Sequence, residues 1–200
     1  MIAILRSGLR SFLRDPMGAL EEMRDIAPAA SVAVMALVAA GLIHVVLDHL
    51  AGAWAFPHSF EPGGKRAGGP VVGTLVVLSR LFGTAAGLWL VARVLGQPVR
   101  WALAMWMVVP FALAEIGLDL LELSTAAIHE LTTLNLYGGL FLIGFTGTLL
   151  VLIASVKAAL PGRDWLGALG ASVVIWGGGT YIPFLVLPIA GILHLTERAK

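Results

Sequence analysis

Charged side chains occur inside long apolar stretches of this 200-residue sequence, where they could carry out chemistry. Arg80 lies ten residues into the apolar run that begins at Pro70, and Glu115 and Asp119 lie late in the run that begins at Trp101. Ionisable side chains are costly inside a membrane, so each of them is a candidate functional residue that needs a partner. Two interpretations are open: a buried ion pair that holds two helices together, and a gate or proton relay.

Arg80 and Glu115 are predicted to pair. At about 1.5 Å per residue, Arg80 lies about 15 Å into its helix, near the middle of a hydrocarbon core about 30 Å thick. By the same arithmetic Glu115 lies about 21 Å from the cytoplasmic boundary at Trp101, so the heights of the two residues differ by about 6 Å. Side chains tilt toward the N-terminus of their own helix, so these two lean toward each other on antiparallel neighbours. One arginine neutralises only one carboxylate, which leaves Asp119 either hydrated or protonated.

Glycines lie on the same predicted helix face as Arg80. Gly73, Gly83 and Gly87 are seven residues before, three after and seven after it. Gly83 and Gly87 also form a small-xxx-small pattern, which lets two helices approach closely. We therefore expect this face, and Arg80 with it, to point into a helix bundle.

Histidine and carboxylate side chains near the predicted outer surface form a candidate metal site. It consists of His44 and Asp48 on one run and Asp119 and Glu122 on another. His44 is about 22 Å along its helix and Asp119 about 27 Å from the cytoplasmic boundary, so the heights allow one shared pocket. Imidazole nitrogen and carboxylate oxygen suit Zn²⁺ or a similar divalent cation. Without a local motif such as HExxH, separate, water-solvated side chains are the alternative.

Five apolar runs position these residues, and each is long enough for a membrane-spanning helix of about 20 residues. They cover approximately residues 29–50, 70–95, 101–121, 134–153 and 166–193. The chain is 58% hydrophobic and only 12% charged, which excludes a soluble globular protein. We predict an all-α integral membrane protein, with a five-helix transmembrane domain over residues 27–200 preceded by an amphipathic leader over residues 1–26. Gly177–Gly179, followed by prolines, predict a break in the last helix, either as a transporter-like substrate site or as a packing kink.

The leader predicts an interfacial helix. Arg6, Arg10 and Arg14 step by four beside an apolar stripe, so the arginines can face lipid phosphates. Asp15 as N-cap and Pro16 at the first helical position then start a second short helix. The leader is either a plain anchor or a regulatory element that senses curvature.

The distribution of charge predicts the orientation of the chain in the membrane, and the composition excludes several classes of function. Eight lysines and arginines flank the runs on the side of the N-terminus and four on the opposite side, which predicts a cytoplasmic N-terminus and an external C-terminus. A net charge of +1 gives no field for nucleic acid, and the absence of cysteine excludes thiol catalysis. No serine lies in a nucleophile-elbow motif, so an enzyme is not expected and no cofactor is implied beyond a possible divalent metal.

The sequence resembles the Yip (Ypt-interacting protein) family from about residue 12 to residue 193. The resemblance rests on Arg14-Asp15-Pro16-Met17-Gly18-Ala19-Leu20 before the first run, on Gly96-Gln97-Pro98-Val99-Arg100-Trp101-Ala102-Leu103-Ala104 with Pro110 downstream, and on Val156-Lys157-Ala158-Ala159-Leu160. It implies a five-span integral membrane protein with a cytoplasmic N-terminus. Eukaryotic members interact with small GTPases, but this chain has only a short leader without the family's Tyr-Gly-Pro-type motif, so that partner is not carried over. Ten arginines against three lysines favour a bacterial inner-membrane member.

Two function classes remain open. The first is a non-enzymatic, multi-pass membrane protein that organises lipids or partner proteins, including further copies of itself. The second is a small permease or ion pathway, for protons or a divalent metal, that uses the polar residues of the first three runs. The expected partners are the lipid bilayer and other membrane proteins.

Overall fold

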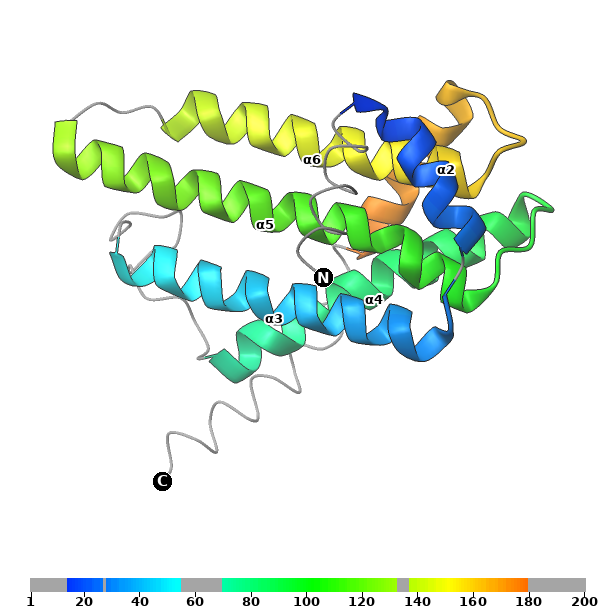
Figure 1. Ribbon diagram of the computed structural model, residues 1–200, viewed down its shortest axis with the longest axis horizontal. Helices are drawn as coiled ribbons and strands as arrows, with labels where there is room; N and C mark the ends of the chain where they lie inside the picture. Colours follow the sequence, from blue (N-terminus) through cyan, green and yellow to red (C-terminus); the bar gives the residue numbers. More distant parts are fainter. Residues whose placement is uncertain (1–13, 27, 55–69, 133–136, 180–200) are drawn as a thin grey trace.

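The computed structural model describes residues 14–26, 28–54, 70–132 and 137–179, and every regular element in these ranges is a helix. The labelled elements are α2 (Pro16–Ile26), α3 (Ala30–Trp54), α4 (Pro70–Val94), α5 (Trp101–Thr132) and α6 (Tyr137–Ala159), followed by a helix over Trp165–Gly179. The longest helix, α5, lies between α3 and α6, and α4 packs against α3 and α5 (Figure 1). The fold is therefore a helix bundle built around α5.

Four helices of the described part are long and apolar enough to cross a membrane. Their apolar windows are Ala30–Leu47, Gly73–Val94, Trp101–Thr125 and Leu142–Ala159. The all-helical fold is confirmed for the described residues, and the four apolar helices agree with a multi-pass membrane protein. The helix Trp165–Gly179 is the start of the predicted fifth span and is still helical at its glycines, whereas Pro183 and Pro188 lie outside the described residues.

Two helices extend past the boundaries that hydropathy predicts. α5 continues to Thr132 instead of ending near residue 121, and α6 continues to Ala159 instead of residue 153. Residues 122–132 contain neither glycine nor proline, so nothing in the sequence stops α5 at the membrane boundary. The length of α5 is therefore not set by the apolar run alone, because the residues that follow the run also favour a helix.

The short helix α2 begins as its sequence predicts and docks on the bundle. The carboxylate of Asp15 accepts a hydrogen bond from the Gly18 N–H at 3.0 Å, which confirms the N-cap. Leu20 is fully buried, and the indole Nε1 of Trp106 on α5 donates to the Met23 carbonyl at 3.1 Å. α2 thereby crosses the ends of α5 and α6 (Figure 1). Of the predicted lipid-facing arginines, Arg14 is exposed, and Arg6 and Arg10 lie outside the described residues.

α4 meets the helix Trp165–Gly179 through small residues. A Cβ added at Gly87 would lie 3.4 Å from the Cα of Ile175. A Cβ added at Gly179 would lie 3.2 Å from the Thr84 nitrogen and 3.3 Å from the Arg80 carbonyl oxygen. Gly83 is also buried, and Gly73 faces Val45 of α3 across ordinary contact distance. The glycines near Arg80 therefore serve close helix contacts on two sides of α4.

We expect Gly179→Ala to destabilise the protein. Overpacking costs about 1–3 kcal/mol, and the better helix propensity of alanine offsets about 1 kcal/mol of this loss. The reason is that the new methyl group would press on backbone atoms of α4, which cannot move aside easily. Gly178→Ala is the matched control, because a Cβ there meets nothing within 4 Å. Thermal unfolding in detergent measures both, and equal melting temperatures would contradict the close contact.

Candidate functional site

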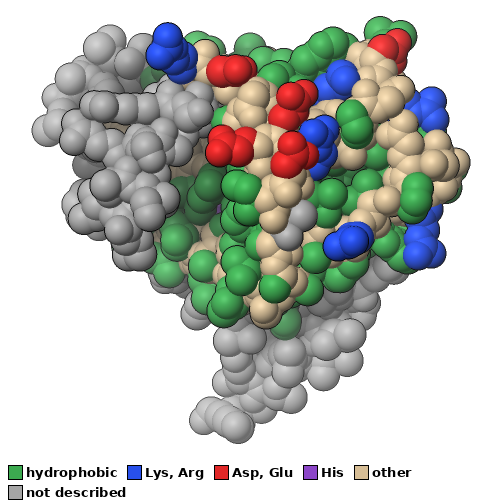
Figure 2. All heavy atoms as spheres, turned by 45° about the vertical axis from the view of Figure 1, so that its right-hand side comes forward, with side chains coloured by type: hydrophobic (Ala, Val, Ile, Leu, Met, Phe, Trp, Pro, Cys, Tyr) green, Lys and Arg blue, Asp and Glu red, His purple; other side chains and the backbone are tan. Residues whose placement is uncertain are grey.

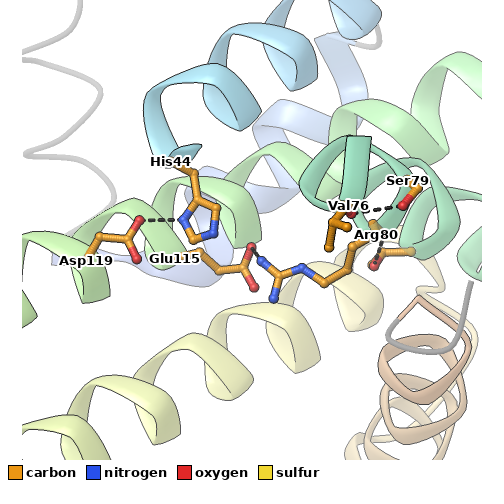
Figure 3. A network of polar contacts seen from close by, with 7 residues as sticks. His44, Val76, Ser79, Arg80, Glu115 and Asp119 are labelled. Atoms are coloured by element: carbon orange, nitrogen blue, oxygen red, sulfur yellow. Dashed lines mark hydrogen bonds and ion pairs between the residues drawn. The ribbon is translucent and has the colours of Figure 1, made fainter. Parts of the chain in front are cut away.

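Two pairs of polar side chains join three helices inside the bundle (Figure 3). The Nη2 of Arg80 on α4 donates to the Oε2 of Glu115 on α5 at 2.7 Å. The Nδ1 of His44 on α3 forms a hydrogen bond with the Oδ2 of Asp119, one turn further along α5. We call these four residues the polar cluster. α5 supplies both acids, and α3 and α4 each supply one basic group.

The polar cluster is largely shielded by protein. The side chains of Glu115 and Asp119 are 10% and 9% exposed, against 28% for Arg80 and 16% for His44. A buried carboxylate without a partner would cost several kcal/mol or more, so each acid needs the basic group that it contacts. The predicted contact between Arg80 and Glu115 is present, and its structural or functional role is a separate question.

Toward the N-terminal end of α5, the polar cluster borders on packed apolar side chains. Val108, Phe111 and Ala112 lie one to two turns before Glu115 on α5, and all three are buried. The hydroxyls of Ser79 and Thr84 on α4 donate to backbone carbonyls of their own helix, at 2.9 Å each. The described part of the chain therefore shows no polar side-chain path from the cluster along this face of α5.

The structure brings two of the four predicted metal ligands into contact. His44 and Asp119 touch, but they do so as a direct hydrogen-bonded pair. Asp48 and Glu122 lie on α3 and α5, and their side chains are outside the described residues. Among the side chains that are described, no three His, Asp or Glu residues come together. A zinc site built on His44 and Asp119 would need further ligands such as these two to reach four-coordination.

Sequence reasoning missed a second polar region, at the end of the bundle that carries α2. A pocket of about 440 Å³ opens there between α2, the α4–α5 connection and the end of α6. Its two charged lining residues are Arg24 and Arg100. The Nε of Arg24 donates to Asp25 at 2.8 Å, and this hydrogen bond raises the pKa of Arg24 above its ordinary value. Arg24 of α2 and Arg100 of the α4–α5 connection line one pocket, and no local pattern in the sequence indicates that they come together.

The α4–α5 connection has a defined geometry. Gly96 ends α4 with a φ of 71°, in the left-handed region that favours glycine. The Gly96 N–H donates to the Arg93 carbonyl at 3.1 Å and the Gln97 N–H to the Ala92 carbonyl at 2.9 Å, which is a Schellman motif. This turn positions Gln97 and the residues that follow it at the mouth of the pocket.

Comparison with protein-family models, curated proteins and solved structures gives no significant match. The similarity to the Yip family therefore rests on the residues quoted above. The function must be argued from the polar cluster and the pocket.

Proposed function

We propose that this chain is a non-enzymatic, multi-pass membrane protein of Yip-like type that organises membrane lipids or partner proteins from its cytoplasmic face. The observation that carries the proposal is the docking of α2 across the ends of α5 and α6, which creates a pocket lined by two arginines at that end of the bundle. Arginine is the side chain best suited to phosphate and carboxylate groups of a membrane surface or a partner.

The polar cluster supports this proposal by its own pairing. Each acid is matched by one basic group from a neighbouring helix, so the four side chains serve to hold α3, α4 and α5 in register. Apolar packing alone specifies the relative position of helices poorly in a membrane, where lipid is as apolar as the side chains. Among the described residues, polar groups available for recognition then lie at the end of the bundle that carries α2.

The composition of lipid that purifies with the protein tests the proposal. We expect the protein, extracted in mild detergent, to retain a higher ratio of anionic to zwitterionic phospholipid than its source membrane, or to give a defined cross-linked partner or oligomer. A Leu20→Ala variant is the control, because it weakens the docking of α2 and should lose the enrichment or the cross-link. Bulk lipid composition with only monomer after cross-linking would contradict the proposal.

The proposed topology has five spans, with the N-terminus in the cytoplasm and the C-terminus outside a bacterial inner membrane. The chain has no cysteine, so single cysteines give an unambiguous label. We expect an impermeant thiol reagent to reach Ala67→Cys, Ser124→Cys and Arg198→Cys from outside and Ser7→Cys only after the membrane is opened. External labelling of position 7 would reverse the orientation, and internal labelling of position 198 would remove the fifth span.

A proton-coupled permease is the second candidate, and the contact between His44 and Asp119 favours it. Imidazole and carboxylate groups are common carriers in proton pathways through membrane proteins, and here one of each lies in direct contact between α3 and α5. In the proposed topology, the buried side chain of Phe111 lies on the cytoplasmic side of the cluster. Proteoliposomes with an internal pH dye test it under an imposed membrane potential. Proton uptake that is lost in Asp119→Asn and kept in Thr148→Val, a buried change on α6, would support transport, and no uptake would contradict it.

A further inference from the structure

The pocket beside α2 combines positive charge with apolar walls. Figure 2 shows that charged side chains of both signs gather on the end of the molecule that carries α2. Within the lining itself, the charges are the guanidinium groups of Arg24 and Arg100, and no acidic residue lines the pocket. The remaining lining residues are mainly apolar: Pro98, Val99, Leu103, Ala159, Pro161 and Gly162, with Gln97 between them. A ligand that fits must therefore carry an anionic group beside an apolar part.

The start of α5 adds to this positive potential. Trp101 is the first residue of a 32-residue helix, and the pocket is lined by Arg100, directly before the helix, and by Leu103 from its first turn. The first N–H groups of a helix have no acceptor within the helix, and their dipoles favour an anion. Here the helix start coincides with a cavity and with two arginines from separate elements. Phosphate, which accepts several charge-assisted hydrogen bonds at once, suits such an arrangement better than a single carboxylate does.

The neighbouring contacts hold one arginine in place and leave the other free to adjust. Arg24 donates to Asp25 at 2.8 Å and to the Ala158 carbonyl at 3.4 Å, so its guanidinium is oriented by α2 and α6. Arg100 is exposed at the pocket mouth. A third arginine, Arg163, donates to the Leu95 carbonyl at 3.2 Å and ties the chain after α6 to the end of α4. Arg24 is thus held in place before any ligand arrives, which reduces the entropy lost on binding, and Arg100 can adjust to the ligand.

We propose that this pocket binds the phosphate group of an anionic phospholipid, with the phosphate between Arg24 and Arg100 and the glycerol and upper acyl carbons against the apolar walls. The inference rests on the proposed function, of which it names the ligand class and the site. Basic pockets between transmembrane helices on the cytoplasmic side are a recognised way of holding lipid head groups. Inorganic phosphate shares the same recognition chemistry, so the experiment separates the two sources.

The test is a calorimetric titration of the full chain in detergent with dioctanoyl phosphatidylglycerol. Dioctanoylglycerol, which lacks phosphate, and inorganic phosphate are titrated in parallel. We expect saturable binding of the phospholipid and at least about tenfold weaker binding by Arg100→Gln, because a hydrogen bond to a charged group contributes enough for that change. Arg93→Gln is the matched control. It removes an exposed arginine from the same end of the bundle, one that stacks 4.1 Å from the ring of Trp89 and does not line the pocket.

Every outcome is informative. Phospholipid binding that falls in Arg100→Gln but not in Arg93→Gln supports the pocket, and equally tight binding of inorganic phosphate would make a soluble phosphate compound the source. Unchanged binding in Arg100→Gln, equal losses in both variants or equal binding of dioctanoylglycerol would overturn the inference. Because Arg24 also contacts α6, Arg24→Gln is interpreted only if its melting temperature matches that of the wild type. If the titration shows no binding at the pocket but anionic lipid is still enriched on purification, the pocket is not the lipid site and the proposed function is unaffected.

Discussion

Glu115→Gln is expected to lower the free energy of unfolding by about 3–5 kcal/mol, the usual cost of removing one partner of a buried ion pair. The loss arises because Arg80, only 28% exposed, would keep its charge inside the bundle without its carboxylate. Arg80→Gln should cost a similar amount by leaving Glu115 without its cation. Unfolding in mixed micelles of mild detergent and dodecyl sulfate measures both changes.

The double variant Arg80→Gln/Glu115→Gln separates pairing from other effects. It leaves no isolated charge in the bundle, so it should recover part of the combined loss, with a coupling free energy of about 0.5–3 kcal/mol. Glu22→Gln on α2 is the matched control, because the same chemical change on an exposed side chain should stay within about 0.5 kcal/mol. Strictly additive losses would mean that the two residues do not interact, despite the 2.7 Å contact.

The polar cluster could be predicted from sequence only in part. The heights of Arg80 and Glu115 differ by only about 6 Å on helices joined by a short connection, and their side chains tilt toward each other, so simple helix geometry predicts their contact. His44 and Asp119 were placed at compatible heights for the same reason, but as metal ligands. The direct pairing depends on α3 lying beside α5, and a sequence with apolar residues on all sides of every helix does not encode which helices are neighbours.

The end of the bundle that carries α2 illustrates a second limit of sequence-based prediction. The amphipathic pattern of the leader is equally compatible with a lipid interface and with a protein surface, because both offer one apolar side. The N-cap at Asp15 was predictable, since it depends on residues three positions apart. The complete burial of Leu20 by the bundle, and the pocket that results, depend on chain segments more than eighty residues away and had no local signal.

Leu20→Ala is expected to cost about 2–5 kcal/mol in the docking of α2, the range for a leucine truncated in a packed site. Leu20 is fully buried, and hydrogen bonds from Trp106 to the Met23 carbonyl and from Arg24 to the Ala158 carbonyl also hold α2. α2 is a separate short element at the edge of the bundle. Its loss should therefore appear as local opening before the spanning helices unfold.

A cysteine at position 17 reports this opening, because the natural chain has no cysteine and Met17 packs against the core. We expect Leu20→Ala to raise the labelling rate of Met17→Cys at least about tenfold, since each 1.4 kcal/mol is a factor of about ten in the open population. Leu166→Ala is the matched control, because it is the same truncation at a side chain that is 77% exposed. Equal labelling rates in the two variants would show that α2 is not held by Leu20, and the pocket wall formed by α2 would then lack its main support.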